Sequence, residues 1–359
     1  MITNIKIAYL RSLYNFFLFV SLTIFFFSTI QSNAKAFDIN NIEISRPFEL
    51  NFSKNKVIDD GFKKAFLNLL SLIVNSSDRK KISSAKLNEI KGMVETFSIK
   101  EEKFINNIYF VNLGVSFNKK KVFNFLEKNN IFPSVPLKKD FLFIPIIIEG
   151  SQKDILIFSN NKFFEIWNEN KEIFHLINYI LPTEDLEDYN TIKKNYDLIE
   201  EYDFKDIIKK YSLENSIVTL IFRNENDVRV LSRITIKDKV ILKNESFSNI
   251  DINNSEQVIK IINNLKLNYE DYWKDLNIIN TSIKLNLNIK VDNIDNLKIK
   301  EFEKILDNSD LVYNYYISKF DKNFIFYKII FNGTPNSFLK TMSEHEYEFD
   351  TQNKLWVLK

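Results

Sequence analysis

Along most of this chain, segments whose hydrophobic residues recur at every second position alternate with segments whose hydrophobic residues recur every three or four positions. Tyr109, Val111 and Leu113 recur at every second position, as in a strand with one buried face. Phe62 and Phe66 belong to a segment whose apolar residues recur every three or four positions, as in an amphipathic helix. Segments of both kinds follow one another to the end of the sequence. The pattern therefore predicts a mixture of α/β and α+β architecture, built as three small domains.

Prolines and continuous apolar runs indicate where the first two domains lie. Pro133 and Pro136 mark a linker after a predicted N-terminal α+β domain, residues 37–135. The second predicted domain, residues 140–270, begins with the apolar run 141–148, which is typical of a strand buried on both faces. Strands and helices alternate after it, so we expect an α/β domain with a mixed sheet.

The third predicted domain, residues 275–359, has the most regular pattern. A strand at 283–291 and a helix at 298–306 precede two strands, 311–320 and 324–331. A helix that begins near Thr334 and a final strand complete the order β-α-β-β-α-β. This order predicts a ferredoxin-like unit. Because that fold supports many unrelated activities, it assigns none.

The first 36 residues have the layout of an export signal. Basic residues precede an apolar run at 13–30, and a short polar stretch leads to Ala34 and Ala36. Small residues at these two positions are what signal peptidase recognises. We therefore predict a signal peptide at 1–36, cleavage after Ala36 and a periplasmic protein.

The alternative is an uncleaved membrane anchor. The apolar run at 13–30 is near the minimum length for a helix that spans a bilayer. The protein would then be anchored in the inner membrane and face the periplasm. Because the basic residues stay in the cytoplasm, both interpretations place residues 37–359 outside it.

Composition excludes several classes of function. The chain has 49 basic and 47 acidic residues, and this balance argues against nucleic acid as a partner. It has no cysteine, which excludes disulfides, thiol catalysis and zinc–thiolate sites. Its five glycines are scattered, so a phosphate-binding loop is not expected. We accordingly predict no cofactor.

Few residues suggest catalysis or metal binding. His175 and His345 are the only histidines, and they fall in different predicted domains. Acidic residues cluster at 184–188, where calcium could bind. The first turn of a helix explains the same cluster, because negative charge there suits the helix dipole. The sequence leaves enzymatic activity uncertain and favours a protein that is not an enzyme.

A hydrolase or small-ligand-binding protein is the alternative function. Its site would lie at the junction of the first two domains, near Glu149 or Asp154. Pockets often form at such junctions. This interpretation requires a deep polar cleft with carboxylates whose pKa values are raised.

Three tyrosines suggest an interaction surface in the third domain. Tyr313 and Tyr315 share one face of a predicted strand, and Tyr327 lies in the next strand. A sheet face lined with tyrosines can bind a peptide, a glycan or a protein. The half-buried outer face of a small sheet explains the same tyrosines and is the favoured interpretation. The expected partners are an envelope protein or peptidoglycan, with membrane contact only through the N-terminal segment.

Residues 62–131 also resemble a known family. The resemblance rests on the helical pattern at 65–70, the strand at 109–117 and Trp167. On these features the chain resembles the long alphaproteobacterial form of an exported proteobacterial family, domain of unknown function 2066, over about 37–240. The resemblance implies no activity and no site residues. The leading hypothesis is therefore a non-enzymatic interaction or assembly module of the cell envelope.

Overall fold

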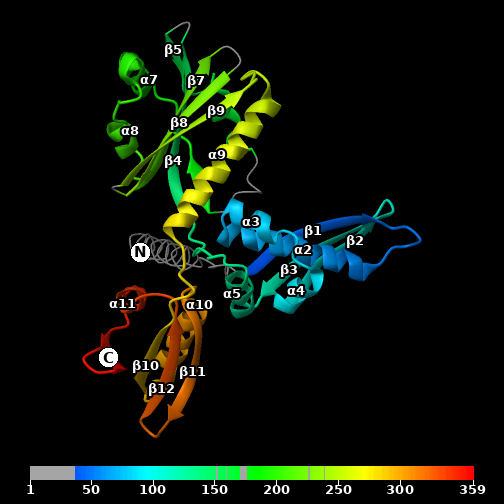
Figure 1. Ribbon diagram of the computed structural model, residues 1–359, viewed down its shortest axis with the longest axis vertical. Helices are drawn as coiled ribbons and strands as arrows, with labels where there is room; N and C mark the ends of the chain where they lie inside the picture. Colours follow the sequence, from blue (N-terminus) through cyan, green and yellow to red (C-terminus); the bar gives the residue numbers. More distant parts are fainter. Residues whose placement is uncertain (1–36, 151–152, 159, 170–175, 225–226, 238) are drawn as a thin grey trace, which may run out of the picture.

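A computed structural model describes residues 37–150, 153–158, 160–169, 176–224, 227–237 and 239–359. In this part, the chain forms three sheets with helices packed against them (Figure 1). The mixed α/β architecture predicted from the sequence is confirmed. The predicted signal segment, residues 1–36, lies outside the described residues.

The N-terminal unit contains a three-stranded antiparallel sheet in the order β1-β3-β2. Its elements are β1 (Asp38–Pro47), α2 (Lys54–Ile73), α3 (Ser76–Ile82), α4 (Leu87–Met93), β2 (Val94–Ile105), β3 (Ile108–Phe117) and α5 (Lys119–Lys128). The apolar side of α2, which includes Phe66 and Leu69, packs into one core with β1 and β3. The sequence pattern predicts no helix at α3 and extends the next helix to Phe97. The structure instead ends α4 at Met93 and begins β2 at the following residue.

The middle unit contains a six-stranded mixed sheet. The strand order is β5-β4-β7-β8-β9, and β6 also pairs with β4. Its elements are β4 (Lys139–Glu149), β5 (Asp154–Leu156), α6 (Lys162–Ile166), β6 (Ile177–Ile180), α7 (Leu186–Lys194), α8 (Lys205–Lys209), β7 (Asn215–Asn224), β8 (Asp227–Ile236), β9 (Lys239–Ser248) and α9 (Ser255–Leu276). β4 runs parallel to β6 and β7, and the other pairs are antiparallel.

Strand β4 is buried on both faces, as its continuous apolar run predicts. Ile144 and Ile146 belong to a core with α7 and α8, whereas Phe143 and Ile147 belong to a core with α6 and α9. All four side chains are at most 1% exposed. Because successive strand residues point to opposite faces, helices on both sides require an apolar residue at every position.

Strand β4 contains a proline at a position where the missing N–H removes no hydrogen bond between strands. β6 pairs with residues 139–142 and β5 with residues 147–149, and Pro145 lies between these two segments. The buried Asn161 fills this position, since its Nδ2 donates to the carbonyls of Pro145 and Leu156 at 3.0 Å each. A residue without an N–H is tolerated here for this reason.

The C-terminal unit has five strands in the order β11-β12-β10-β14-β13. Its elements are β10 (Leu285–Asp292), α10 (Asn296–Asn308), β11 (Val312–Phe320), β12 (Phe324–Phe331), α11 (Pro335–Ser343), β13 (Phe349–Asp350) and β14 (Leu355–Leu358). β12 lies between β10 and β11 and is antiparallel to both, which is the predicted split β-α-β arrangement. The short β13 adds one reversal, so β14 enters between β10 and β13 and runs parallel to β10.

The long helix α9 connects the units. The sequence pattern ends this helix near Leu265, but it continues to Leu276 because its last turns contact the N-terminal unit. Asp271 accepts the backbone N–H of Ser76 at 2.9 Å, and the Trp273 indole donates to the Leu137 carbonyl at 2.6 Å. These hydrogen bonds attach the start of α3 and the linker before β4 to the last turns of α9.

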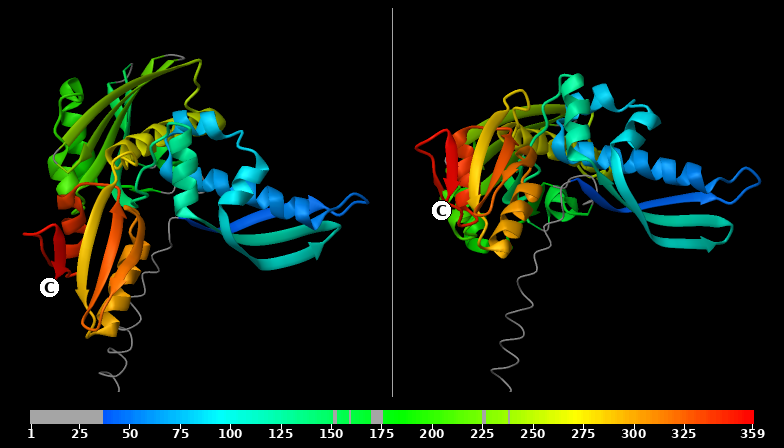
Figure 2. Two further views of the ribbon diagram at one scale, coloured as in Figure 1. Left: turned by 60° about the horizontal axis from the view of Figure 1, so that its bottom comes forward. Right: turned by 90° about the horizontal axis from the view of Figure 1, so that it is seen from below.

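The three units give the molecule an extended shape. The sheet of the N-terminal unit projects sideways from the axis formed by the other two units (Figures 1 and 2). We call β1, β2, β3 and α2 the arm. The distal end of the arm is formed by the loop at 48–53 and by the turn between β2 and β3.

Candidate functional site

Strand β2 forms an open edge of the arm. The sheet order gives it a neighbouring strand only on the β3 side, within the residues that the structure describes. Each of its twelve residues is exposed or half-buried. The turn to β3 contains Asn106 and Asn107, whose φ angles of 50° and 57° are left-handed. Such angles suit a tight hairpin turn.

The apolar residues of β2 are only partly covered by α2. Phe97, Ile99 and Phe104 are 47%, 38% and 55% exposed. Phe97 and Ile99 pair with the β3 residues Val115 and Leu113, which are at most 2% exposed. Paired residues point to the same face. Helix α2 therefore fully covers the apolar side chains on this face of β3 and covers those of β2 only in part.

Aromatic rings gather at the distal end of the arm. Phe48 lies 4.7 Å from Phe52 and 5.0 Å from Phe104 between ring centroids, and Phe52 lies 5.1 Å from Tyr109. We call these four residues the tip cluster. With Lys54, Glu102 and Lys103, they line an open cavity of about 410 Å³. Leu50, beside the cluster, is fully exposed. Exposed apolar groups gathered in this way are typical of contact surfaces.

Glu102 connects the tip cluster to the start of α2. The Lys54 ammonium donates to both of its carboxylate oxygens, at 2.8 and 2.9 Å, and the Tyr109 hydroxyl donates at 2.9 Å. The hydrogen bond from Lys54 lowers the pKa of Glu102, and the same bond raises the pKa of Lys54. Burial raises the pKa of Tyr109. Near neutral pH, both charges are therefore fixed, and such a carboxylate is a poor general acid.

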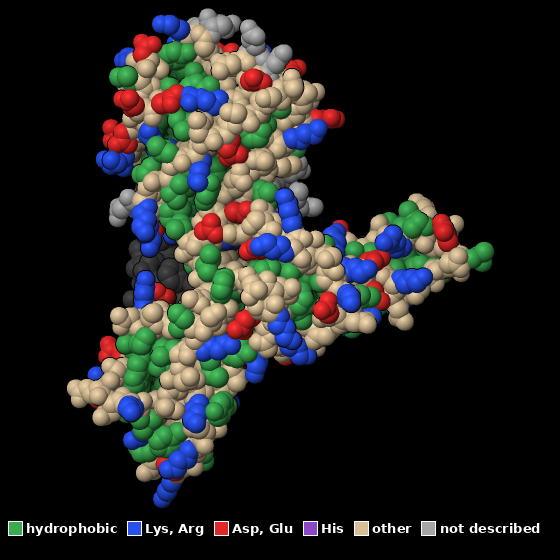
Figure 3. All heavy atoms as spheres, in the orientation of Figure 1, with side chains coloured by type: hydrophobic (Ala, Val, Ile, Leu, Met, Phe, Trp, Pro, Cys, Tyr) green, Lys and Arg blue, Asp and Glu red, His purple; other side chains and the backbone are tan. Residues whose placement is uncertain are grey.

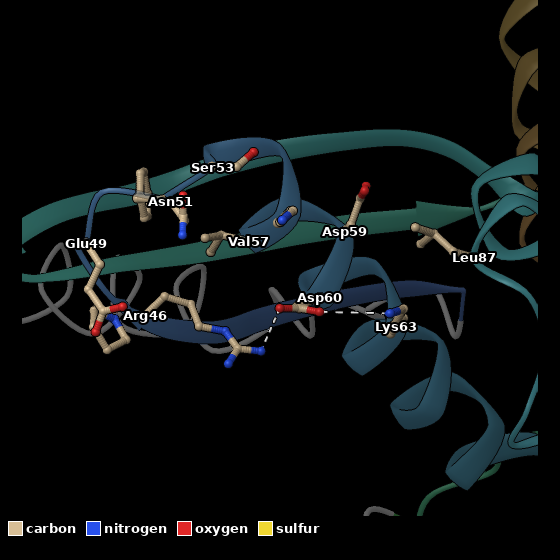
Figure 4. Close-up of a pocket in the computed structure, with 12 residues that line it drawn as sticks. Arg46, Glu49, Asn51, Ser53, Val57, Asp59, Asp60, Lys63 and Leu87 are labelled. Atoms are coloured by element: carbon tan, nitrogen blue, oxygen red, sulfur yellow. Dashed lines mark hydrogen bonds and ion pairs between the residues drawn. The ribbon is translucent and has the colours of Figure 1, made fainter.

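A second cavity borders the loop at 48–53 (Figure 4). Its volume is about 450 Å³, and residues of β1, α2 and the loop line it. Asp60 accepts a hydrogen bond from Arg46 at 2.8 Å and lies 4.0 Å from the Lys63 ammonium. Phe52 lines both cavities. The distal end thus has an aromatic cavity and a charged cavity that share Phe52 in their walls.

The tyrosines predicted as an interaction surface have partners within the molecule. The Tyr327 ring is fully buried and its hydroxyl donates to Glu303 at 2.8 Å, while the Tyr315 hydroxyl donates to Asp307 at 3.0 Å. Both acceptors belong to α10. The Tyr313 hydroxyl donates to an asparagine of α5 at 2.9 Å. Burial raises the pKa of Tyr315 and Tyr327.

The carboxylates of the alternative ligand site lie elsewhere than the predicted junction. Glu149 and Asp154 are at the β4–β5 end of the middle unit, away from the N-terminal unit (Figure 1). Glu149 pairs with Arg223 at 3.2 Å, and Asp154 pairs with Lys193 at 2.8 Å. The bond from Lys193 lowers the pKa of Asp154. A cavity of about 440 Å³ lies nearby, lined by Arg223 and Gly150 among others.

The acidic cluster at 184–188 begins a helix, as one of its two interpretations predicts. The Asp185 carboxylate caps α7 by accepting the backbone N–H of Glu187 at 2.8 Å. The Lys210 ammonium contacts Asp185 at 3.1 Å and Asp188 at 2.6 Å. This cation occupies the position that calcium would need.

The remaining predicted site residues are not brought together. His345 is exposed in the turn after α11, and its N–H donates to the Met342 carbonyl at 3.0 Å. His175, Ala34 and Ala36 lie outside the described residues. Across the described ranges, no three histidine, aspartate or glutamate side chains are arranged to hold a metal ion.

Comparisons with known proteins add no relative. No family model matches the chain, and no curated protein matches it. The family resemblance noted from the sequence stays a prediction. In the part of the chain that the structure describes, no helix combines the length and the apolar character needed to span a membrane.

The tip cluster does not follow from the sequence pattern. Alternation of apolar residues between Ile42 and Phe52 predicts one continuous strand, whereas β1 ends at Pro47. The missing N–H of proline is the signal for this end. The charged run at 100–103 is typical of an edge strand, and it is the only sequence signal for the exposure of β2.

Proposed function

We propose that the protein is an exported, non-enzymatic interaction or assembly module of the cell envelope. The arm is the part that binds its partner. One observation carries this proposal. Strand β2 lies at the edge of a projecting sheet, and all twelve of its residues remain exposed or half-buried. Export rests on the sequence of residues 1–36.

The partner of β2 is an extended segment of another protein. An edge strand has a row of backbone N–H and C=O groups that only another strand can pair regularly. Strand addition of this kind gives affinity through the backbone and specificity through alternate side chains. The half-covered Phe97 and Ile99 would be buried further by an added strand beside them.

Charges and irregular pairing restrict which strand can join. Lys100, Glu101, Glu102 and Lys103 occupy the distal half of β2, and its register with β3 shifts at two places. These features protect an edge from indiscriminate association. We therefore expect a partner strand with acidic residues opposite the lysines and basic residues opposite Glu101.

The tip cluster supplies the apolar anchor of the interface. Its rings and the cavity of about 410 Å³ can accept a hydrophobic side chain at the end of the added strand. Aromatic residues that surround a desolvated pocket contribute most of the energy in many interfaces. Phe48 and Phe104 are both about half exposed, so they have apolar area left to bury.

Photo-crosslinking in living cells tests this proposal. A photoreactive residue at Ser98 in β2 should form a reproducible adduct with one envelope protein. Ser246 in β9 is the matched control, because it is an exposed serine in another edge strand whose inner face packs against α9. Equal adducts at both positions, or none at Ser98, would contradict the proposal.

A variant of the distal end separates the anchor from the strand. Leu50→Ser should reduce the Ser98 adduct several-fold without changing thermal unfolding. Leu186→Ser, which alters an exposed leucine of the middle unit, should leave the adduct unchanged. Sequencing the mature N-terminus separately distinguishes cleavage, with Phe37 first, from an anchor that retains Met1.

A further inference from the structure

The C-terminal sheet has one covered face and one open face. Helices α10 and α11 contribute Phe302 and Phe338 to a single core with the inward residues of β10 and β12. Figures 1 and 2 show α10 on one side of this sheet only. The opposite face is formed by the outward residues of β10, β11, β12 and β14. Figure 3 shows basic and hydrophobic side chains interspersed over this unit.

One row across the open face places an aromatic ring between two lysines. Strand pairing sets Phe326 opposite Lys290 on one side and opposite Lys319 on the other. The Lys319 ammonium lies 5.1 Å from the Phe326 ring centroid, and the Lys290 ammonium lies 3.7 Å from the Phe324 centroid. Attraction between cation and ring holds the charges above the sheet.

The next rows add a lysine, a tyrosine and several amides. Lys328 lies between Asn288 and Tyr316, and Tyr316 is 48% exposed. Asn286 and Asn314 flank the following row. Lysines, hydrogen-bonding amides and aromatic rings therefore lie in neighbouring rows of the open face. We call this surface the lysine–aromatic face.

The lysine–aromatic face carries positive charge that the molecule does not neutralise. Among described residues, Lys290 and Lys328 form no ion pair, and Lys319 has only a loose contact with Asp321 at 3.9 Å. Asp292 is the one acidic residue at the outward positions of β10, β11 and β12. The charge therefore suits an anionic partner.

We infer that the lysine–aromatic face binds an anionic glycan chain of the class to which peptidoglycan belongs. Aromatic rings stack on the apolar faces of sugars, amides bond to hydroxyl groups, and lysines attract carboxylates. The helices leave this face of the sheet open, so it suits an extended polymer better than a small molecule, which needs an enclosing pocket. This inference rests on the proposed function, because only an exported protein meets the cell wall.

Co-sedimentation with purified peptidoglycan tests the inference, using protein produced from the complete coding sequence. The wild type should sediment with peptidoglycan and be released by high salt. The pair Lys290→Glu and Lys328→Glu should lower the affinity by on the order of tenfold. The control pair Lys300→Glu and Lys304→Glu removes the same charge from α10 and should bind normally. Loss of binding in both pairs, or in neither, would overturn the inference.

A ring variant distinguishes a glycan from other anions. Tyr316→Ala should weaken sedimentation with peptidoglycan and leave weak binding to anionic lipid vesicles unchanged. Vesicle binding as strong as peptidoglycan binding would show a lipid surface instead and reject the glycan. Failure here with a normal Ser98 adduct on the arm would remove only this inference. Loss of the adduct alone would remove only the proposed function of the arm.

Discussion

Strands β4 and β2 have similar lengths but opposite environments. Eight of the eleven residues of β4 are buried between helices on both faces of its sheet, whereas β2 has no fully buried residue. The run 141–148 is entirely apolar, and the β2 sequence mixes Phe and Ile with Lys and Glu. This difference in burial indicates different roles for the two strands. Strand β4 stabilises the body of the molecule, and β2 leaves backbone and side chains available to a partner.

The largest expected effect compares one residue type in the two strands. Ile147→Ala in β4 removes a fully buried side chain and should lower the free energy of unfolding by roughly 2–5 kcal/mol. Ile99→Ala in β2, where the side chain is 38% exposed, should cost less than about 1 kcal/mol. Urea denaturation followed by circular dichroism measures both. Equal losses would break the comparison.

A second substitution tests the hydrogen bonds beside β4. The buried Glu270 carboxylate accepts the N–H groups of Leu176 and Ile177 at 3.2 and 2.8 Å, just before β6 pairs with β4. Glu270→Ala leaves both donors unpaired and should cost about 1–3 kcal/mol for each. Glu270→Gln keeps an acceptor oxygen and should cost less in the same urea titration. Equal costs would show that the two hydrogen bonds contribute little.

The pH dependence of stability tests the contact between the last turns of α9 and the N-terminal unit. Burial lowers the pKa of Lys274 to about 8, with Glu270, Asp271, Asp275 and Arg79 as its charged neighbours. In the unfolded chain this lysine titrates near its usual pKa of about 10.4. Between about pH 8 and 10 the unfolded state therefore binds more protons, and stability should rise with pH.

Its slope is at most about 1.4 kcal/mol per pH unit from this lysine. Burial also lowers the pKa of Lys119 to about 8, so that residue adds to the same rise. Lys274→Met should remove the contribution of Lys274 to the rise of stability with pH and leave the contribution of Lys119. Thermal unfolding at pH 8, 9 and 10 measures this, and an unchanged slope in the variant would contradict it.

The smallest effect concerns the exposed ion pair at the distal end of the arm. Glu102→Gln removes the charge that pairs with Lys54, but both side chains are about half exposed. The change should cost less than about 1 kcal/mol of stability and disappear in high salt. Asp188→Asn, at a buried carboxylate paired with Lys210, should cost more in a parallel urea titration. A larger loss for Glu102→Gln would show that the arm depends on its surface charges.

The sequence predicts local elements far better than their neighbours in space. The spacing in 109–117 and the apolar run 141–148 predict one half-buried strand and one fully buried strand, and both are confirmed. Strand order depends on contacts distant in sequence, so the charged run at 100–103 is the only local sign that β2 is an edge. Tyr327 is predicted as part of an interaction surface, yet it shares its face of β12 with Ile325 and Ile329, and α10 covers that side of the sheet. A buried tyrosine keeps a polar hydroxyl, so the residue type alone does not show whether its ring is buried or exposed.

Amide hydrogen exchange across the arm tests the open edge most directly. In the isolated protein, β3 is paired on both sides and its amides should exchange slowly throughout. The β2 amides that point away from β3 should exchange orders of magnitude faster than those that bond to it. Uniform protection along residues 94–105 at low protein concentration would show that the edge is already covered, and it would contradict the proposed partner-binding role of the arm.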